Sequence, residues 1–191
     1  MGASKTLAVL IAPGFNMAAT MSFIDPFRAV NYLAGEPLYL WRLVHTEAEP
    51  PRASNGARLD AARYDDAADA PDYGVVSTSW RPELTYDRIR PIIRRWRRHG
   101  SELIGVDTGG FVLAAAGVLA GRRATVHYEH IDAFAETYGD VEVTEELFTI
   151  DGPCATTCGG GAATDLALHL IGRDLSAADA NAAARYLFHE R

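Results

Sequence analysis

The stretch Glu102-Leu-Ile-Gly-Val-Asp-Thr-Gly-Gly-Phe-Val-Leu-Ala-Ala-Ala-Gly117 decides the fold. It opens with an apolar run, residues 103–106, which is long enough for a buried strand, and after two glycines it continues with helical character over residues 111–116. A strand, a one-residue corner and a helix form the geometry of a nucleophile elbow, whose corner residue is Cys or Ser in an enzyme. The corner residue here is Asp107. The sequence therefore predicts an elbow that carries a carboxylate.

Strands and helices alternate along the rest of the chain. Apolar runs predict strands at about residues 6–12, 39–44, 73–77, 123–126, 141–143, 147–150 and 154–157, and helical spacing predicts helices at 16–33, 87–99, 130–138, 162–171 and 176–188. Pro26 predicts a kink in the first helix, or a restart with Asp25 as N-cap. The alternation predicts an α/β fold, a three-layer sandwich in which helices cover both faces of a mostly parallel sheet.

Length and composition restrict the class of protein. A chain of 191 residues suits one domain over residues 1–191, and a net charge of -7 disfavours non-specific nucleic-acid binding by this chain. No apolar run is long enough to span a membrane, and the N-terminus lacks the features of a signal peptide. Cys154 and Cys158 are too few for a disulfide scaffold, and their spacing is not that of a redox or zinc pair. We expect a soluble cytoplasmic protein.

Candidate site residues follow several of the predicted strands. In parallel α/β sheets the site forms outside the carboxyl ends of the strands, at a switch in strand order. The residues expected there, and predicted to line a ligand pocket over the elbow, come from five separate stretches: Asn16, Met17, Ser79, Trp80, Asp107, Thr108, His127, Tyr128 and Cys158.

Four motifs carry a family resemblance. They are Thr108-Gly-Gly-Phe-Val-Leu-Ala-Ala-Ala-Gly-Val-Leu-Ala-Gly-Arg-Arg-Ala-Thr-Val-His127, Tyr128-Glu-His-Ile-Asp-Ala-Phe134, Asp25-Pro-Phe-Arg-Ala-Val-Asn31 and Cys158-Gly-Gly-Gly-Ala-Ala-Thr-Asp-Leu166. With these motifs the chain resembles the ThiJ/PfpI superfamily, which has the flavodoxin-like fold of class I glutamine amidotransferases. Within it, the likeness is to the sensor half of AraC-family transcription regulators of the GlxA group.

The chain departs from the catalytic members of that superfamily at two positions. They have Cys where this chain has Asp107, and the Glu that many of them place after the first strand aligns with about Ala19, with no acid between Gly14 and Met21. His127 fills the position of the partner His, but it has no thiol to activate. The chain is therefore expected not to be an enzyme.

The resemblance also implies partners. The regulators that the chain resembles are similar to it in lacking a catalytic site. Several of them are thought to sense cationic nitrogen compounds such as betaine, carnitine or arginine. It implies a small-molecule effector of that kind, a homodimer and no cofactor. It further implies a C-terminal pair of helix-turn-helix units that would bind DNA and that this sequence does not contain.

Several residues allow more than one role. Asp107 is a ligand carboxylate, a cap that accepts amide hydrogens of its own helix, or a general base. Trp80, Tyr128 and Phe15 either wall a pocket for a quaternary ammonium group or pack in the interior.

The alternative function is that of a hydratase or hydrolase. Such an enzyme would use Asp107 or Cys158 together with His127, although the favoured reading of Cys158 is a small, partly buried residue near the pocket. His127, Glu129 and His130 are possible metal ligands by residue type, but no further ligand is evident, so no metal is expected.

Overall fold

The computed structural model describes residues 4–78 and 80–189. The strands are β1 (Lys5–Ile11), β2 (Tyr39–His45), β3 (Ala62–Arg63), β4 (Tyr73–Thr78), β5 (Glu102–Asp107), β6 (Arg123–Ala124), β7 (Glu142–Val143), β8 (Phe148–Asp151) and β9 (Cys154–Thr157). The helices are α1 (Met17–Ala34), α2 (Tyr86–Arg98), α3 (Gly109–Ala115), α4 (Ile131–Thr137), α5 (Gly161–Asp174) and α6 (Ala177–Tyr186), with 3-10 turns η1 (Pro82–Thr85) and η2 (Tyr128–His130). None of the described helices is long and apolar enough to cross a membrane.

The central sheet is mostly parallel, and the predicted fold class is confirmed. Its strand order is β3-β2-β1-β4-β5-β9-β8, with β8 antiparallel to β9 and the other neighbours parallel, while β6 and β7 form a separate small pair. The order reverses between β1 and β4, because the chain builds β2 and β3 on one side and β4 and β5 on the other. The carboxyl ends of β1, β4 and β5 therefore meet at the switch point, where such sheets bind ligands.

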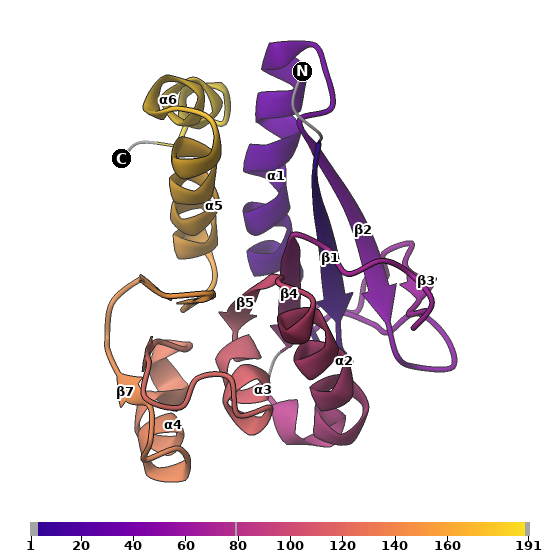
Figure 1. Ribbon diagram of the computed structural model, residues 1–191, viewed down its shortest axis with the longest axis vertical. Helices are drawn as coiled ribbons and strands as arrows, with labels where there is room; N and C mark the ends of the chain where they lie inside the picture. Colours follow the sequence, from indigo (N-terminus) through magenta and orange to yellow (C-terminus); the bar gives the residue numbers. More distant parts are fainter. Residues whose placement is uncertain (1–3, 79, 190–191) are drawn as a thin grey trace.

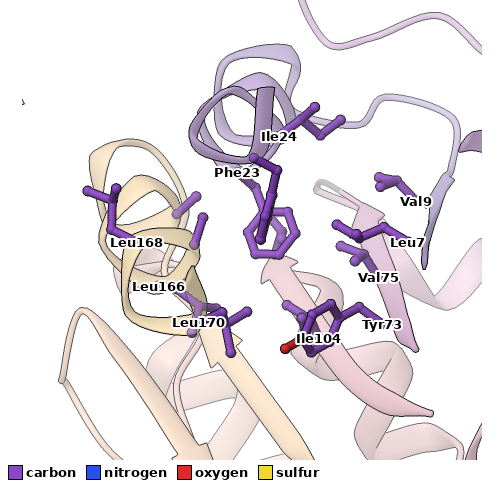
Figure 2. Packing of buried hydrophobic residues seen from close by; sticks show 14 of the residues in the cluster. Leu7, Val9, Phe23, Ile24, Tyr73, Val75, Ile104, Leu166, Leu168 and Leu170 are labelled. Carbon is purple, nitrogen blue, oxygen red and sulfur yellow. The ribbon is translucent and has the colours of Figure 1, made fainter. Parts of the chain in front are cut away.

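Helices cover both faces of the sheet. Figure 1 shows α1 and α5 side by side, with α6 beyond them near the C-terminus and α2 and α3 on the opposite side of the strands. Side chains of β1 alternate between two cores, with Leu7 and Val9 in one and Ala8 and Leu10 in the other. Figure 2 shows the first core, in which Phe23 of α1 lies between the sheet and α5.

The helix α1 corrects one prediction. It runs without a break from Met17 to Ala34 through Pro26, so the restart capped by Asp25 is wrong. Proline removes one backbone hydrogen bond, but Pro26 is buried and lies between the fully buried Phe23 and Phe27. We attribute the continuity of α1 to this packing, which outweighs the local preference for a break.

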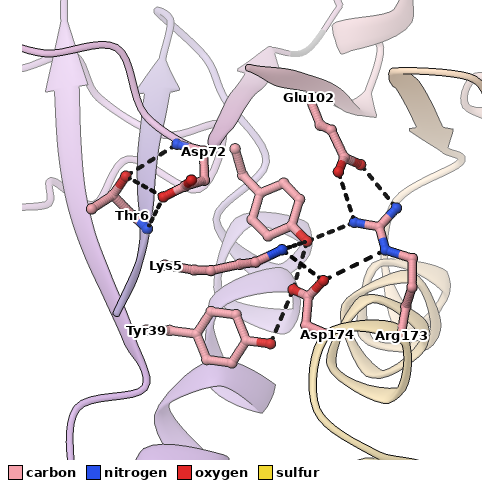
Figure 3. A network of polar contacts seen from close by, with 8 residues as sticks. Lys5, Thr6, Tyr39, Asp72, Glu102, Arg173 and Asp174 are labelled. Carbon is pink, nitrogen blue, oxygen red and sulfur yellow. Dashed lines mark hydrogen bonds and ion pairs between the residues drawn. The ribbon is translucent and has the colours of Figure 1, made fainter. Parts of the chain in front are cut away.

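A polar network closes the amino ends of the strands (Figure 3). The Asp174 carboxylate at the end of α5 accepts hydrogen bonds from Lys5 Nζ at 2.8 Å, from the Tyr39 hydroxyl at 3.1 Å and from the Tyr73 hydroxyl at 2.6 Å. Its side chain is only 4% exposed. Burial is the largest cause that raises the pKa of both tyrosines, followed by their contact with Asp174. The network fixes α5 to three strands at the end of the sheet opposite the elbow.

Candidate functional site

The elbow has a backbone geometry that few residues adopt. Asp107 ends β5 with a φ of 62°, in the left-handed region, and α3 begins two residues later. Glycines allow α3 to approach the sheet: a Cβ at Gly109 would lie 2.3 Å from the Val76 carbonyl oxygen, and one at Gly105 would lie 2.7 Å from the Gly110 nitrogen. The strained corner is thus held by close packing of α3 on β4 and β5.

The Asp107 carboxylate is buried and hydrogen-bonded. Asn16 donates from Nδ2 to Asp107 Oδ2 at 2.9 Å, while Asn16 Oδ1 accepts from the Ala19 amide and caps α1. Asp107 is 5% exposed, and this burial raises the pKa of its carboxyl. The Asn16 hydrogen bond, His127 and the Thr108 amide each lower that pKa, but burial dominates. The Asp107 side chain is therefore more readily protonated in the folded chain than a carboxyl group in water.

The position expected for the catalytic Glu has no polar side chain. Ala19 is fully buried in the first turn of α1. A Cβ at Gly159 would lie 3.5 Å from Ala19 Cβ and 3.3 Å from Asp107 Oδ2, so the glycine loop after β9 also packs against the carboxylate. Asn16 supplies the polar contact to Asp107, a pairing that spans 91 positions of sequence.

Two imidazoles and an indole lie next to one another beside the elbow. The Trp80 ring centroid is 5.9 Å from that of His127 and 5.5 Å from that of His130, both edge-on. His127 Nδ1 and His130 Nε2 are buried without a hydrogen-bond partner within the described part of the chain. The Tyr128 ring lies 4.6 Å from the His127 ring and is 75% exposed. His127 Nδ1 also lies 3.8 Å from Glu129 Oε2, which is an ion-pair distance when the imidazole is protonated.

Cys158 follows β9 and is partly buried. Burial raises the pKa of its thiol, and the neighbouring Asp107 carboxylate raises it further. A nucleophilic cysteine needs the opposite change, because the thiolate is the reactive form.

Two described cavities contain predicted site residues. One has a volume of about 480 Å³ and is lined by Thr125, Val126, Tyr128, Ile131, Asp132, Glu145, Glu146, Leu147 and Cys158. The other has a volume of about 280 Å³ and is lined by Trp80, Pro82, Glu83, Tyr86, Thr108, Phe111, His130, Ala133, Thr137 and Tyr138. Trp80 and Thr108 thus line the smaller of these two cavities, and Tyr128 and Cys158 line the larger one.

The remaining predicted residues are located as follows. Asn16 and Met17 are at the start of α1, and both are half-buried. Ser79 lies outside the described residues. Phe15 is fully buried in the core, so its interpretation as a pocket wall is wrong. Across residues 4–78 and 80–189, no three His, Cys, Asp or Glu side chains are grouped in a way that could hold a metal ion.

Sequence reasoning missed most of the smaller cavity. The sequence predicts Phe111 and Tyr138 only as parts of helices, and it gives Tyr86 and Glu83 no role. The only signal for Tyr86, Phe111 and Tyr138 in the sequence is that each is an aromatic residue near one end of a predicted helix.

Comparison with known proteins relates the chain to transcription regulators. A scan of known protein-family profiles finds no match. The chain is 39% identical over 172 residues to the HTH-type transcriptional regulator CdhR of Pseudomonas aeruginosa, covering 88% of this chain and 50% of the relative. It is 31% identical over 161 residues to the HTH-type transcriptional regulator GlxA of Rhizobium meliloti, covering 83% and 49%. The chain therefore spans about half the length of these curated relatives.

Solved structures show the same fold. An AraC family transcriptional regulator from Pseudomonas putida superposes with a TM-score of 0.89 at 22% identity, covering 96% of this chain and 99% of that one. A ThiJ/PfpI family protein from Pseudomonas syringae gives a TM-score of 0.85 at 18% identity, covering 99% and 76%. The chain has the fold of the ThiJ/PfpI proteins and is related in sequence to the GlxA-type regulators, as its motifs predicted.

Proposed function

We propose that the chain is the non-catalytic sensing domain of an AraC-family transcription regulator and that it binds a cationic nitrogen metabolite of the betaine, carnitine or basic amino acid type. The observation that carries this proposal is the residue at the elbow. Asp107 occupies the corner at a φ of 62°, buried and hydrogen-bonded to Asn16, where a catalyst of this superfamily would need a thiol. The curated relatives named as regulators support the regulatory half of the proposal.

The effector is proposed to bind at the carboxyl ends of β1, β4 and β5. The candidate contacts are those predicted from the sequence: Asn16, Met17, Ser79, Trp80, Asp107, Thr108, His127, Tyr128 and Cys158. A net charge of -7 favours the approach of a cation.

The enzyme alternative requires a reactive group that this site disfavours. A hydrolase built on Cys158 would need a lowered thiol pKa, whereas burial raises it. Asp107 could act as a base only when ionised, and burial disfavours that form. His127 Nδ1 makes no hydrogen bond among the described residues but lies 3.8 Å from Glu129 Oε2, so the imidazole has a carboxylate and no thiol beside it.

The whole protein is proposed to act on DNA through a part that this chain does not contain. The regulators CdhR and GlxA are about twice as long as the segment that matches, which leaves room for helix-turn-helix units. Effector binding would then shift a homodimer, or the linked DNA-binding half, between two states, which requires unequal affinity of the effector for those states.

Binding and turnover can be measured on the same samples. The chain should bind at least one member of a panel of glycine betaine, carnitine, choline and arginine in calorimetric titrations, and proton NMR should recover that compound unchanged after long incubation. Release of a product that disappears in Asp107→Asn or Cys158→Ala would replace the sensor by an enzyme. If no member of the panel binds, the proposed effector class is wrong.

A further inference from the structure

The smaller cavity has an unusual lining for its size. Four of its ten lining residues are Trp, Tyr or Phe. They are Trp80 before η1, Tyr86 at the start of α2, Phe111 in α3 and Tyr138 just after α4. Its volume of about 280 Å³ lies just below the usual range of ligand pockets, about 300–1,000 Å³, so it suits a compact group.

The rings form a connected wall. The His130 ring lies 5.5 Å from Trp80 and 6.2 Å from Phe111, and the Phe111 ring lies 6.1 Å from Tyr138. The Tyr138 hydroxyl donates to the Tyr86 hydroxyl at 3.1 Å, which joins α4 to α2 across the cavity. Trp80 remains 59% exposed although it touches two histidines, so its indole has surface available to a ligand.

The charged group in the lining is negative. Apart from His130, Glu83 is the single residue in this lining with an acidic or basic side chain. Its Oε1 forms an exposed ion pair with Arg81 Nε at 3.2 Å. Such a pair in solvent is weak and leaves the carboxylate free to reorient. Aromatic faces attract a cation through the negative potential of their π systems, and the attraction is strongest for Trp.

We propose that the cavity lined by Trp80, Tyr86, Phe111 and Tyr138 is the binding site for the alkylated ammonium group of the effector, with Glu83 as its counter-charge. This inference rests on the proposed sensing function and names the part of the site that selects the ligand. Thr108 lines the same cavity and is adjacent to Asp107, so a molecule held there by its ammonium group can extend toward the elbow.

This placement also gives the elbow a different role. Asp107 is buried and already bonded to Asn16, and so it offers little surface to a bulky ammonium group. We assign to Asp107 the positioning of Asn16 and of the first turn of α1, and to the aromatic cavity the recognition of positive charge.

The probe for the test is choline, compared with its neutral carbon isostere, in which a tert-butyl group replaces the trimethylammonium group. The two molecules have the same shape, so a difference in affinity reports charge. Calorimetric titration of the wild-type chain should give binding of choline at least about tenfold tighter than that of the isostere. Nuclear Overhauser effects between the N-methyl protons and aromatic ring protons should locate the group directly.

Variants separate the cavity from the elbow. Trp80→Ala should weaken choline binding at least about tenfold, and Glu83→Gln should weaken it by a smaller factor. Tyr138→Phe keeps the ring and should bind choline within about twofold of wild type. Trp41→Ala is the matched control, because Trp41 is also surface-exposed but lies on β2 in the lining of another cavity.

Each outcome decides the inference. It is overturned if choline does not bind, if the isostere binds equally well, or if Trp80→Ala binds choline as wild type does. Loss of binding in Asp107→Asn with unchanged binding in Trp80→Ala would also overturn it while leaving the sensing function intact. The sensing function itself would fail on a different result, the conversion of the bound compound to a product.

Discussion

Replacing Gly109 by alanine should destabilise the chain strongly, because α3 lies directly on β4 at that point. The added Cβ would lie 2.3 Å from the Val76 carbonyl oxygen, whereas ordinary contacts are 3.4–4 Å. The obstacle is backbone, so relief requires a shift of α3 relative to the sheet of about 1 Å or more. We expect a loss of about 3 kcal/mol in the free energy of unfolding. For a chain of this length that loss lowers Tm by roughly 6–12 °C.

Urea denaturation and thermal melting of Gly109→Ala measure this effect, with Gly139→Ala as the control. A Cβ at Gly139 meets no atom within 4 Å, and its φ is not in the left-handed region, so its effect should stay within about 0.5 kcal/mol. The reasoning about the elbow is refuted if the two variants unfold at the same denaturant concentration, because α3 would then not be held by its contact with β4.

Three further predictions concern charge and reactivity. Asp174→Ala should lower the free energy of unfolding, measured by urea denaturation, by about 3–5 kcal/mol, because it leaves Lys5 and two buried tyrosine hydroxyls without their acceptor. Asp25→Ala breaks only an exposed pair with Arg28 and should lower it by less than about 1 kcal/mol. Equal losses in the two variants would contradict the role of the network. Burial raises the Asp107 pKa in the folded chain, so above the ordinary value of 3.8 the folded state binds more protons than the unfolded state. The free energy of unfolding should therefore fall as pH rises from 3.8 through the raised pKa, and Asp107→Asn should lack this fall in pH-dependent denaturation. Identical pH profiles of the two proteins would contradict burial of the carboxyl. At neutral pH, iodoacetamide should react with Cys158 more slowly than it reacts with free glutathione, because burial raises the pKa of the Cys158 thiol. Cys154 should react more slowly still, because burial raises the pKa of its thiol to about 11. If mass spectrometry showed that Cys158 reacts faster than glutathione, a nucleophilic role for Cys158 would again be possible.

The fold could be predicted because its signals are local. The elbow is encoded in sixteen consecutive residues, and the alternation of apolar runs with helical periodicity gave the sheet class and most element positions. The failure at Pro26 has a different origin. A break is favoured locally, but Phe23 and Phe27 on either side are fully buried, and that long-range packing has no signature near the proline.

The site was predictable only in part, because side-chain contacts between distant segments decide it. Asn16 and Asp107 were both candidates, but their hydrogen bond depends on the switch point in the sheet, which brings α1 beside the end of β5. The aromatic cavity depends on α4 packing near the start of α2, 52 positions apart at the Tyr86–Tyr138 contact. Nothing in the sequence near either tyrosine indicates that pairing.

Incubation of the purified chain with choline, glycine betaine, carnitine and arginine, followed by intact-protein mass spectrometry and proton NMR of the small molecules, tests most directly whether this pocket recognises without reacting. We expect saturable binding of at least one compound, its full recovery in unchanged form, and a protein mass with no addition at Cys158 or elsewhere. A stable adduct on the protein, or a chemically altered compound in solution, would show that the pocket is still catalytic despite Asp107.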